Sequence, residues 1–227
     1  SDGQGGTDTA TVAITVNGIN DPPVANDDSN ASYTTDEDSP FTSGNVLDND
    51  TDVDGVALSV QSFDASGTVG NVTSNGDGTF NYDPNGLYET LGVGETATDS
   101  FEYTVTDGFA GTDTAMVSIT INGINDQPTA DDDSGAQYTT AENAAFTTGN
   151  VLDNDDDIDG GALSVAGVDT SGTVGDITNN GDGTFGYDPD GQFDSLPPGQ
   201  TAIDTFSYTV SDGNGGTDTA TVTITIA

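Results

Sequence analysis

The sequence repeats itself at a constant offset, without insertion or deletion between the copies. The segment SDGQGGTDTATVAITVNGIND at 1–21 returns as TDGFAGTDTAMVSITINGIND at 106–126, and GNVLDNDTDVDG at 44–55 returns as GNVLDNDDDIDG at 149–160. Both pairs are 105 residues apart (106 − 1 and 149 − 44). A unit of this size corresponds to a whole domain, because the repeats of solenoid proteins are only about 20 to 50 residues long.

The repeat predicts two domains and a leading segment. We expect one domain at residues 22–126 and a second at residues 127–227. Residues 1–21 match the end of a unit, so we expect them to be the terminal strand and linker of a preceding repeat. The chain is therefore expected to be part of a longer tandem array.

Alternation of apolar and polar residues dominates each unit. Phe101, Tyr103 and Val105 alternate with polar residues, and they share one face of a strand because successive side chains point to opposite faces. Similar segments recur near residues 34, 41, 58, 69, 80, 101 and 117 of the first unit. About seven short strands per unit are typical of an immunoglobulin-like sandwich, so the expected fold class is all-β. The one segment with a helical tendency, 86–94, is limited to a turn or two by its glycines.

The chain contains no side chain that carries a positive charge. It has 40 Asp plus Glu, no Lys, Arg, His or Cys, and a formal net charge of −40 at pH 7. Contacts with nucleic acids and anionic membrane surfaces depend on Lys and Arg, and no apolar run is long enough to span a bilayer. We therefore expect no nucleic-acid partner and no membrane insertion. The usual catalytic bases, nucleophiles and zinc ligands are also missing, so we do not expect an enzyme.

The densest acidic segment is DNDTDVDG at 48–55, which returns as DNDDDIDG at 153–160. Counted from Asp50 or Asp155, the segment begins like an EF-hand loop, with the pattern D-x-D-x-D-G. The twelfth position is Gln61 in one unit and Ala166 in the other, whereas an EF-hand loop requires Glu there, so an EF-hand is excluded. Two like charges about 4 Å apart repel by roughly 1 kcal/mol in water and about 4 kcal/mol at intermediate dielectric. We therefore expect a bound cation, and Asp supplies the oxygen ligands that Ca²⁺ prefers.

Four motifs resemble, in the same order, the calcium-binding motifs of cadherins. VNGINDPPVA resembles their DxNDNxP linker, and TDVDG resembles their DxD loop. Glu37 in DEDSPF resembles the Glu near the start of their first strand. YTVTDG resembles the acidic turn before their last strand. The whole pattern is similar to the cadherin-like (VCBS) repeats of large secreted bacterial adhesins, many of which carry RTX export signals. The resemblance covers both units and the leading segment. It implies tandem seven-stranded Ig/cadherin-like Greek-key β-sandwiches.

The resemblance also implies Ca²⁺ bound where consecutive domains meet. Between the two units, the implied ligands are Glu37, Asp83, Asn125, Asp126, Asp157, Asp159 and Asp212. A partial site at the start of the first unit would use Asn20, Asp21, Asp52, Asp54 and Asp107. The chain departs from the cadherin pattern at Pro22 and Gln127, which replace the second Asn of the linker, and around Asp83. These departures leave the number of ligands open.

The function implied by the resemblance is structural. We expect calcium-rigidified extender (stalk) repeats of a large extracellular bacterial adhesin, secreted or on the cell surface, that support adhesion and biofilm formation. Their partners would be the adjacent repeats of the same polypeptide, through calcium-bound linkers. The alternative is a calcium-dependent module that binds carbohydrate or a like domain on another cell. Tyr33, Tyr82, Tyr88 and Phe109 are candidate sugar contacts, although packing in or beside the core is the favoured role of these residues.

The leading segment has a further expected consequence. A strand without its own domain can extend the sheet edge of another molecule. We therefore expect strand-exchange association through residues 9–16.

Overall fold

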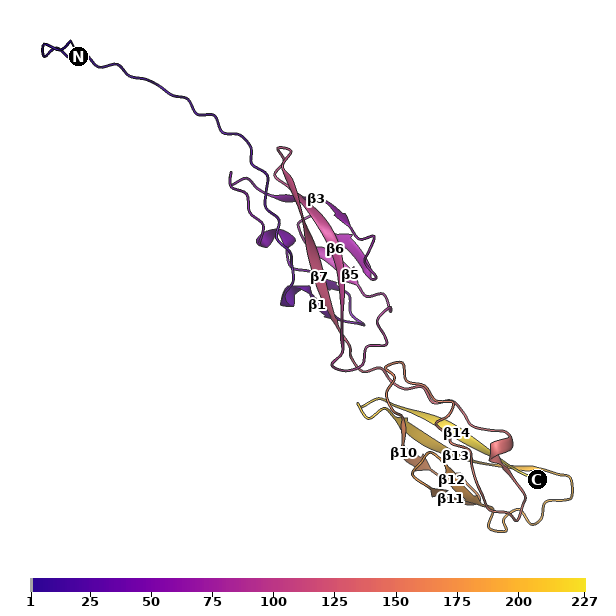
Figure 1. The fold of residues 1–227 in the computed structure, drawn as a ribbon. Helices are drawn as coiled ribbons and strands as arrows, with labels where there is room; N and C mark the ends of the chain where they lie inside the picture. Colours follow the sequence, from indigo (N-terminus) through magenta and orange to yellow (C-terminus); the bar gives the residue numbers. More distant parts are fainter. Residues whose placement is uncertain (1) are drawn as a thin grey trace.

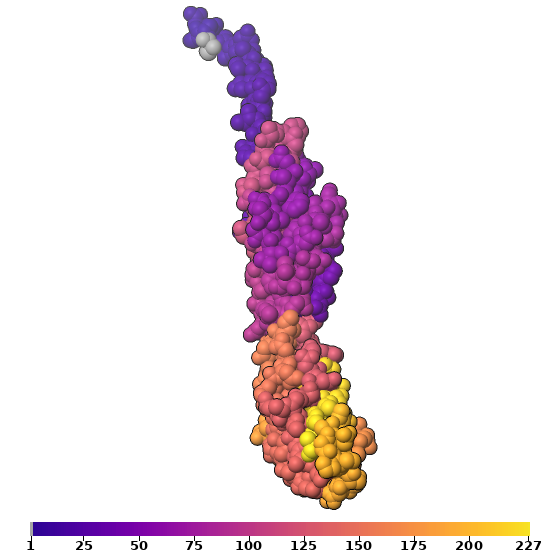
Figure 2. All heavy atoms as spheres, turned by 90° about the vertical axis from the view of Figure 1, so that its right-hand side faces the viewer, coloured from indigo at the N-terminus to yellow at the C-terminus, as the bar shows by residue number. Residues whose placement is uncertain are grey.

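The computed structural model describes residues 2–227, which form fourteen strands in two modules that follow one another end to end (Figure 1). The first module contains strands β1 to β7 and the second contains β8 to β14. Figure 2 shows both as one elongated body, with the leading segment as a single extended chain. Ser1, the first residue of the expected terminal strand and linker, lies outside the described residues.

The first module is a seven-stranded sandwich, as the alternation predicts. Its strands are β1 (Thr34–Asp36), β2 (Phe41–Thr42), β3 (Ser59–Asp64), β4 (Asn71–Ser74), β5 (Phe80–Asp83), β6 (Thr96–Thr106) and β7 (Thr112–Asn122). One sheet has the order β1-β7-β6-β3 and the other has the order β2-β5-β4. β1 runs parallel to β7, whereas the other pairs are antiparallel.

The second module repeats this arrangement. Its strands are β8 (Thr139–Thr140), β9 (Phe146–Thr147), β10 (Ser164–Asp169), β11 (Asp176–Asn179), β12 (Phe185–Asp188), β13 (Ala202–Ser211) and β14 (Thr217–Ile226). The sheets have the orders β10-β13-β14-β8 and β11-β12-β9. The predicted all-β fold of tandem sandwiches is therefore confirmed.

Between the strands, the described residues contain three short 3₁₀ helices: η1 (Ala31–Tyr33), η2 (Val46–Asp48) and η3 (Ala136–Tyr138). Asn side chains begin the first two, where Asn30 and Asn45 each accept a hydrogen bond from the backbone two residues later. Helices of three residues are too short to show an apolar periodicity, so the sequence does not predict them. Residues 86–94 form turns rather than a regular helix.

The core follows the predicted alternation. Phe101, Tyr103 and Val105 of β6 are buried, and so are the alternating apolar residues of β7 at 115, 117, 119 and 121. Tyr33 and Tyr82 are buried too, which confirms core packing and removes them as sugar contacts. Tyr88 packs against this core, and Phe109 stays exposed.

The leading segment extends away from the first module without forming a strand (Figures 1 and 2). Val12, Ile14 and Val16 are 81, 84 and 87% exposed, whereas the matching residues of β7 are fully buried. The segment thus has the sequence of a core strand but no sheet among residues 2–227.

Candidate metal centre at the module junction

The parallel pairing of β1 with β7 brings two acidic segments to the same end of the first module. Asp36 pairs with Asn122, so the residues that follow both strands leave the sheet together. Glu37 follows β1, and the linker of residues 123–128 follows β7. We call this region, together with the loop 155–160 of the second module, the junction.

Glu37 is anchored to the linker and is 1% exposed. Its Oε1 accepts a hydrogen bond of 2.8 Å from the backbone N–H of Ile124. Its Oε2 is buried and has no hydrogen-bond partner among residues 2–227. One carboxylate oxygen therefore fixes the orientation of the side chain, and the other is left for a ligand.

The second module holds the linker through its own acidic residues. The backbone N–H of Asp126 donates to Asp159 Oδ2 at 2.9 Å. The N–H of Asp159 in turn donates to Asp157 Oδ1 at 3.0 Å. Asn125 Nδ2 donates to Asp212 Oδ2 at 2.8 Å. These bonds orient the linker against both the acidic loop and the turn before β14.

The same side chains leave oxygen atoms without partners. The buried oxygens with no partner in the described chain include Glu37 Oε2, Asn125 Oδ1, Asp126 Oδ2 and Asp159 Oδ1. Glu37, Asp126 and Asp159 each offer an oxygen within 4.8 Å of the others. Buried oxygens normally have a partner, and a set of carboxylate and amide oxygens from three segments matches the ligands of a hard divalent cation such as Ca²⁺.

The electrostatics of the junction favour neutralisation of its carboxylates by a positive charge. Burial raises the pKa of Glu37, and the carboxylates of Asp126, Glu89 and Asp159 raise it further, against the lowering effect of the Ile124 N–H. Burial also raises the pKa of Asp126, together with the charges of Asp159, Asp38 and Asp157. Each group therefore resists ionising unless positive charge is nearby.

Six of the seven residues expected at the junction come together: Glu37, Asn125, Asp126, Asp157, Asp159 and Asp212. Asp83 stands apart from the groups of converging carboxylates; it is exposed at the end of β5, where its Oδ1 accepts from the Asn85 N–H. In its place, Glu89 and Asp38 converge on Asp126.

Glu89 is not predictable from the sequence, because its turn-rich loop has no motif that relates it to the linker. Gly123 allows this approach, since a Cβ at that position would overlap the carbonyl oxygens of Leu91 and Gly92. The loop of residues 86–94 also reaches the second module, where Gly92 faces Asp159. Only the fold brings these segments together.

The start of the first module carries the corresponding half-site. Asn20 Nδ2 donates to Asp107 Oδ2 at 2.7 Å, and the N–H of Asp21 donates to Asp54 Oδ2 at 2.9 Å. The N–H of Asp54 donates to Asp52 Oδ1 at 2.7 Å, and Asp52 Oδ2 lacks a partner in the described part of the chain. Asp21 and Asp54 are exposed here, whereas Asp126 and Asp159 are half-buried. The five residues expected at this end therefore lie together without a counterpart of Glu37.

Comparisons with known proteins agree with this organisation. A family described as the bacterial cadherin-like domain matches residues 20–123 and 125–227. The calcium-binding lectin RapA2 of Rhizobium johnstonii is 33% identical over 216 residues, which cover 81% of this chain and 89% of the lectin. The crystal structure of the protocadherin GammaB4 extracellular domain is similar with a TM-score of 0.51 at 18% identity, over 93% of this chain and 33% of that chain.

Within residues 2–227, no helix combines the length and the apolar character that a membrane crossing requires.

The structural likeness to the protocadherin supports the sandwich fold. The family match covers both modules. The chain therefore belongs to the bacterial cadherin-like domain family.

Proposed function

We propose that this chain is part of an extracellular stalk whose modules are held in line by Ca²⁺ at their junctions. The proposal rests mainly on four buried oxygens, from Glu37, Asn125, Asp126 and Asp159, that have no hydrogen-bond partner in the described part of the chain. They come from the first module, the linker and the second module. A cation shared by all three segments would therefore hold the modules at one angle.

The protein's own residues prepare this site before any ion arrives. Hydrogen bonds from Ile124 to Glu37 and from Asp126 to Asp159 fix each carboxylate through one oxygen. When bound, Ca²⁺ would supply the positive charge that the chain lacks and accept six to eight oxygen ligands. Without it, the remaining oxygens repel one another and the linker is free to bend.

The leading segment extends the proposal to a longer array. Asn20, Asp21, Asp52, Asp54 and Asp107 would form a complete site once an upstream module supplied the counterpart of Glu37. We propose that residues 1–21 are the terminal strand and linker of that upstream repeat, and that residues 22–126 and 127–227 are successive repeats. A rigid spacer of this kind suits a secreted or surface-attached bacterial adhesin and a role in biofilm formation, with no catalytic function.

A pair of matched variants tests the junction. Calcium at about 100 times its dissociation constant stabilises the folded state by about 2.7 kcal/mol per site, which raises the melting temperature. Glu37→Gln keeps the acceptor for Ile124 but removes the charge, so it should lose most of this gain. Glu142→Gln, 105 residues later (142 − 37) and beside the C-terminal residue Ala227, should keep it. Equal calcium-induced shifts in the two variants would contradict the proposal.

A second candidate is calcium-dependent carbohydrate binding. It is favoured by the likeness to RapA2, which is described as a calcium-binding lectin. Phe109, on the turn between β6 and β7, is the exposed aromatic residue that remains among the expected sugar contacts. Binding to a glycan array that requires both Ca²⁺ and Phe109 would support this candidate, and the absence of binding in millimolar Ca²⁺ would contradict it. Calcium-dependent contact between like domains would instead appear as concentration-dependent dimers that dissociate in chelator.

A further inference from the structure

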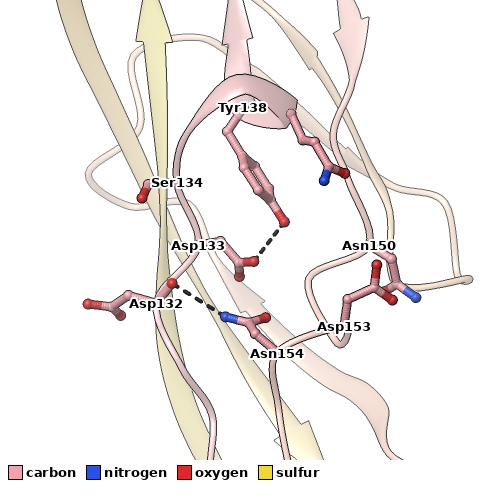
Figure 3. Close-up of a pocket in the computed structure, with 8 residues that line it drawn as sticks. Asp132, Asp133, Ser134, Tyr138, Asn150, Asp153 and Asn154 are labelled. Carbon is pink, nitrogen blue, oxygen red and sulfur yellow. Dashed lines mark hydrogen bonds between the residues drawn. The ribbon is translucent and has the colours of Figure 1, made fainter.

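An acidic hollow of about 270 Å³ lies on the flank of the second module, and Figure 3 shows the residues that line it. Its lining comes from residues 132–138 and from residues 150–154. Asp133 bridges to Val222, in the middle of β14, whereas the junction residue Asp212 precedes that strand. The hollow is therefore separate from the candidate metal centre already described.

Asp133 lies at the base of the hollow and is 5% exposed. Its Oδ1 accepts a short hydrogen bond of 2.6 Å from the hydroxyl of Tyr138. Its Oδ2 is buried and finds no hydrogen-bond partner anywhere in residues 2–227. Figure 3 shows the Asp133 carboxylate directed into the space between Tyr138 and the loop that carries Asp153.

Around Asp133, the oxygen atoms that can accept a hydrogen bond outnumber the hydroxyl protons that can be donated to them. The Tyr208 hydroxyl has one proton, yet it lies 2.9 Å from the Val151 carbonyl oxygen and 2.9 Å from each carboxylate oxygen of Asp155. Asp153 lines the hollow and is exposed. No side chain of the protein can supply a positive charge here, because the sequence has no Lys, Arg or His.

A proton is the other way to neutralise Asp133. Burial raises the pKa of Asp133 to about 6, and the Asp155 and Asp132 carboxylates contribute to the rise, while the hydroxyls of Tyr138 and Tyr208 oppose it. A group with this pKa is mostly ionised at pH 7.5. At neutral pH and above, Asp133 is therefore available as an anionic oxygen ligand.

The first module repeats the arrangement. Asp28 is also 5% exposed, its Oδ1 accepts from the Tyr33 hydroxyl at 3.0 Å, and its Oδ2 again lacks a partner in the described chain. Asp48 stands where the second module has Asp153, 105 residues later (153 − 48). A tyrosine-bound Asp with one unpartnered buried oxygen, followed 20 residues later by a second Asp (48 − 28 and 153 − 133), thus stands at matching positions of the two modules.

We propose that each module binds a divalent cation with oxygen ligands, such as Ca²⁺, within this flank hollow. In the second module the ligands are Asp133 Oδ2 and the Asp153 carboxylate, completed by water; in the first they are Asp28 Oδ2 and the Asp48 carboxylate. The hollow is large enough for a partly hydrated ion, since one water molecule occupies about 30 Å³. The flank sites would make the stability of a single module depend on divalent cations. This inference does not rest on the junction sites.

Two measurements on the full chain test the flank sites. In a crystal soaked with Tb³⁺, an ion with the same oxygen preference, anomalous scattering should reveal a peak about 2.3–2.6 Å from Asp133 Oδ2. In equilibrium dialysis with radioactive Ca²⁺, Asp153→Asn should bind one ion fewer per chain than the parent protein. Asp153 is exposed, so this variant keeps its fold even if Asp133→Asn does not. The matched control is Asp176→Asn, an exposed carboxylate on β11 that should leave the count unchanged.

The outcomes separate this inference from the proposed function. Terbium in the flank hollows with an empty junction would support the flank sites and contradict the stalk proposal. Terbium at the junction alone, with the same calcium count in Asp153→Asn and the parent, would overturn the flank sites and leave a proton as the partner of Asp133.

Discussion

Buried carboxylates of this protein differ in whether their oxygen atoms have partners. Asp99 is buried beneath the turn before β4, and its carboxylate accepts hydrogen bonds from the N–H groups of Val69 and Gly70 and from the hydroxyl of Tyr82. Glu37 and Asp133, in contrast, each keep one oxygen without a partner in residues 2–227. A satisfied carboxylate stabilises the fold by itself, whereas an unsatisfied one indicates a ligand.

Replacement of Asp99 should therefore destabilise the first module whether or not a metal is present. The Ser100 N–H also donates to this carboxylate, so Asp99→Ala leaves four donors without their acceptor. We expect a loss of about 3 kcal/mol in the free energy of unfolding. Urea unfolding in chelator measures this loss. Glu102→Ala, which removes an exposed carboxylate from the same strand, should change stability by less than about 0.5 kcal/mol. Similar effects of both variants would contradict the role of Asp99.

The pH dependence of this contribution has a definite sign. Burial alone would raise the pKa of Asp99, but the donors from Gly70, Tyr82, Val69 and Ser100 together hold it below its ordinary value of 3.8. A lowered pKa stabilises the folded state above the ordinary value, and the gain is lost as the pH falls through the folded pKa. The stability difference between the parent and Asp99→Ala should therefore be constant above pH 5 and shrink below about pH 3.8. A difference that grows on acidification would contradict this assignment.

At the scale of elements, loops and strand ends determine which acidic residues meet. The end of β7 and the turn-rich loop 86–94 approach so closely at Gly123 that a side chain there would overlap the loop backbone. This contact places Glu89 beside Asp126. The matching residue of the leading segment, Gly18, has no neighbour within 4 Å of the same position.

This difference predicts unequal effects of two identical substitutions. Gly123→Ala should push the loop 86–94 away from the linker, lower the stability of the first module by about 1–3 kcal/mol and weaken calcium binding at the junction. Gly18→Ala should do neither. Thermal unfolding of both variants measures stability, and calorimetric titration with Ca²⁺ measures binding at the junction. Calcium binding that is unchanged in Gly123→Ala would show that Glu89 does not act at the junction.

The leading segment makes a prediction of its own. Its exposed apolar residues match the buried face of β7, so pairing with the sheet edge of a second chain would bury them. We expect the chain to self-associate through residues 9–16. Deletion of residues 1–18 should abolish this association, and analytical ultracentrifugation of both forms measures it. The deletion retains Asn20 and Asp21. A dimer that survives it would point to an interface elsewhere.

The sequence predicted elements better than contacts between them. Alternation at Phe101, Tyr103 and Val105 identified β6 because burial on one face of a strand has a local pattern. The positions of Asp83 and Glu89 follow instead from how a turn-rich loop folds back on the linker, which no local pattern records. The pairing of Asp99 with Tyr82 is likewise a consequence of packing between sheets.

At the scale of the whole molecule, the charge of −40 is distributed over both modules. Exposed charges act over only about 8 Å at physiological ionic strength, so repulsion between the modules is concentrated where they touch. The junction is where the carboxylates of both modules approach most closely in the described clusters. Neutralisation of this one region should therefore change the shape of the molecule without changing the fold of either module.

Small-angle X-ray scattering of the chain in chelator and in millimolar Ca²⁺ tests this claim most directly, with the samples kept dilute enough to be monomeric. In Ca²⁺ we expect a larger radius of gyration and a distribution of interatomic distances that extends to a greater maximum, because the two modules become fixed in line. Superimposable scattering profiles under the two conditions would contradict it.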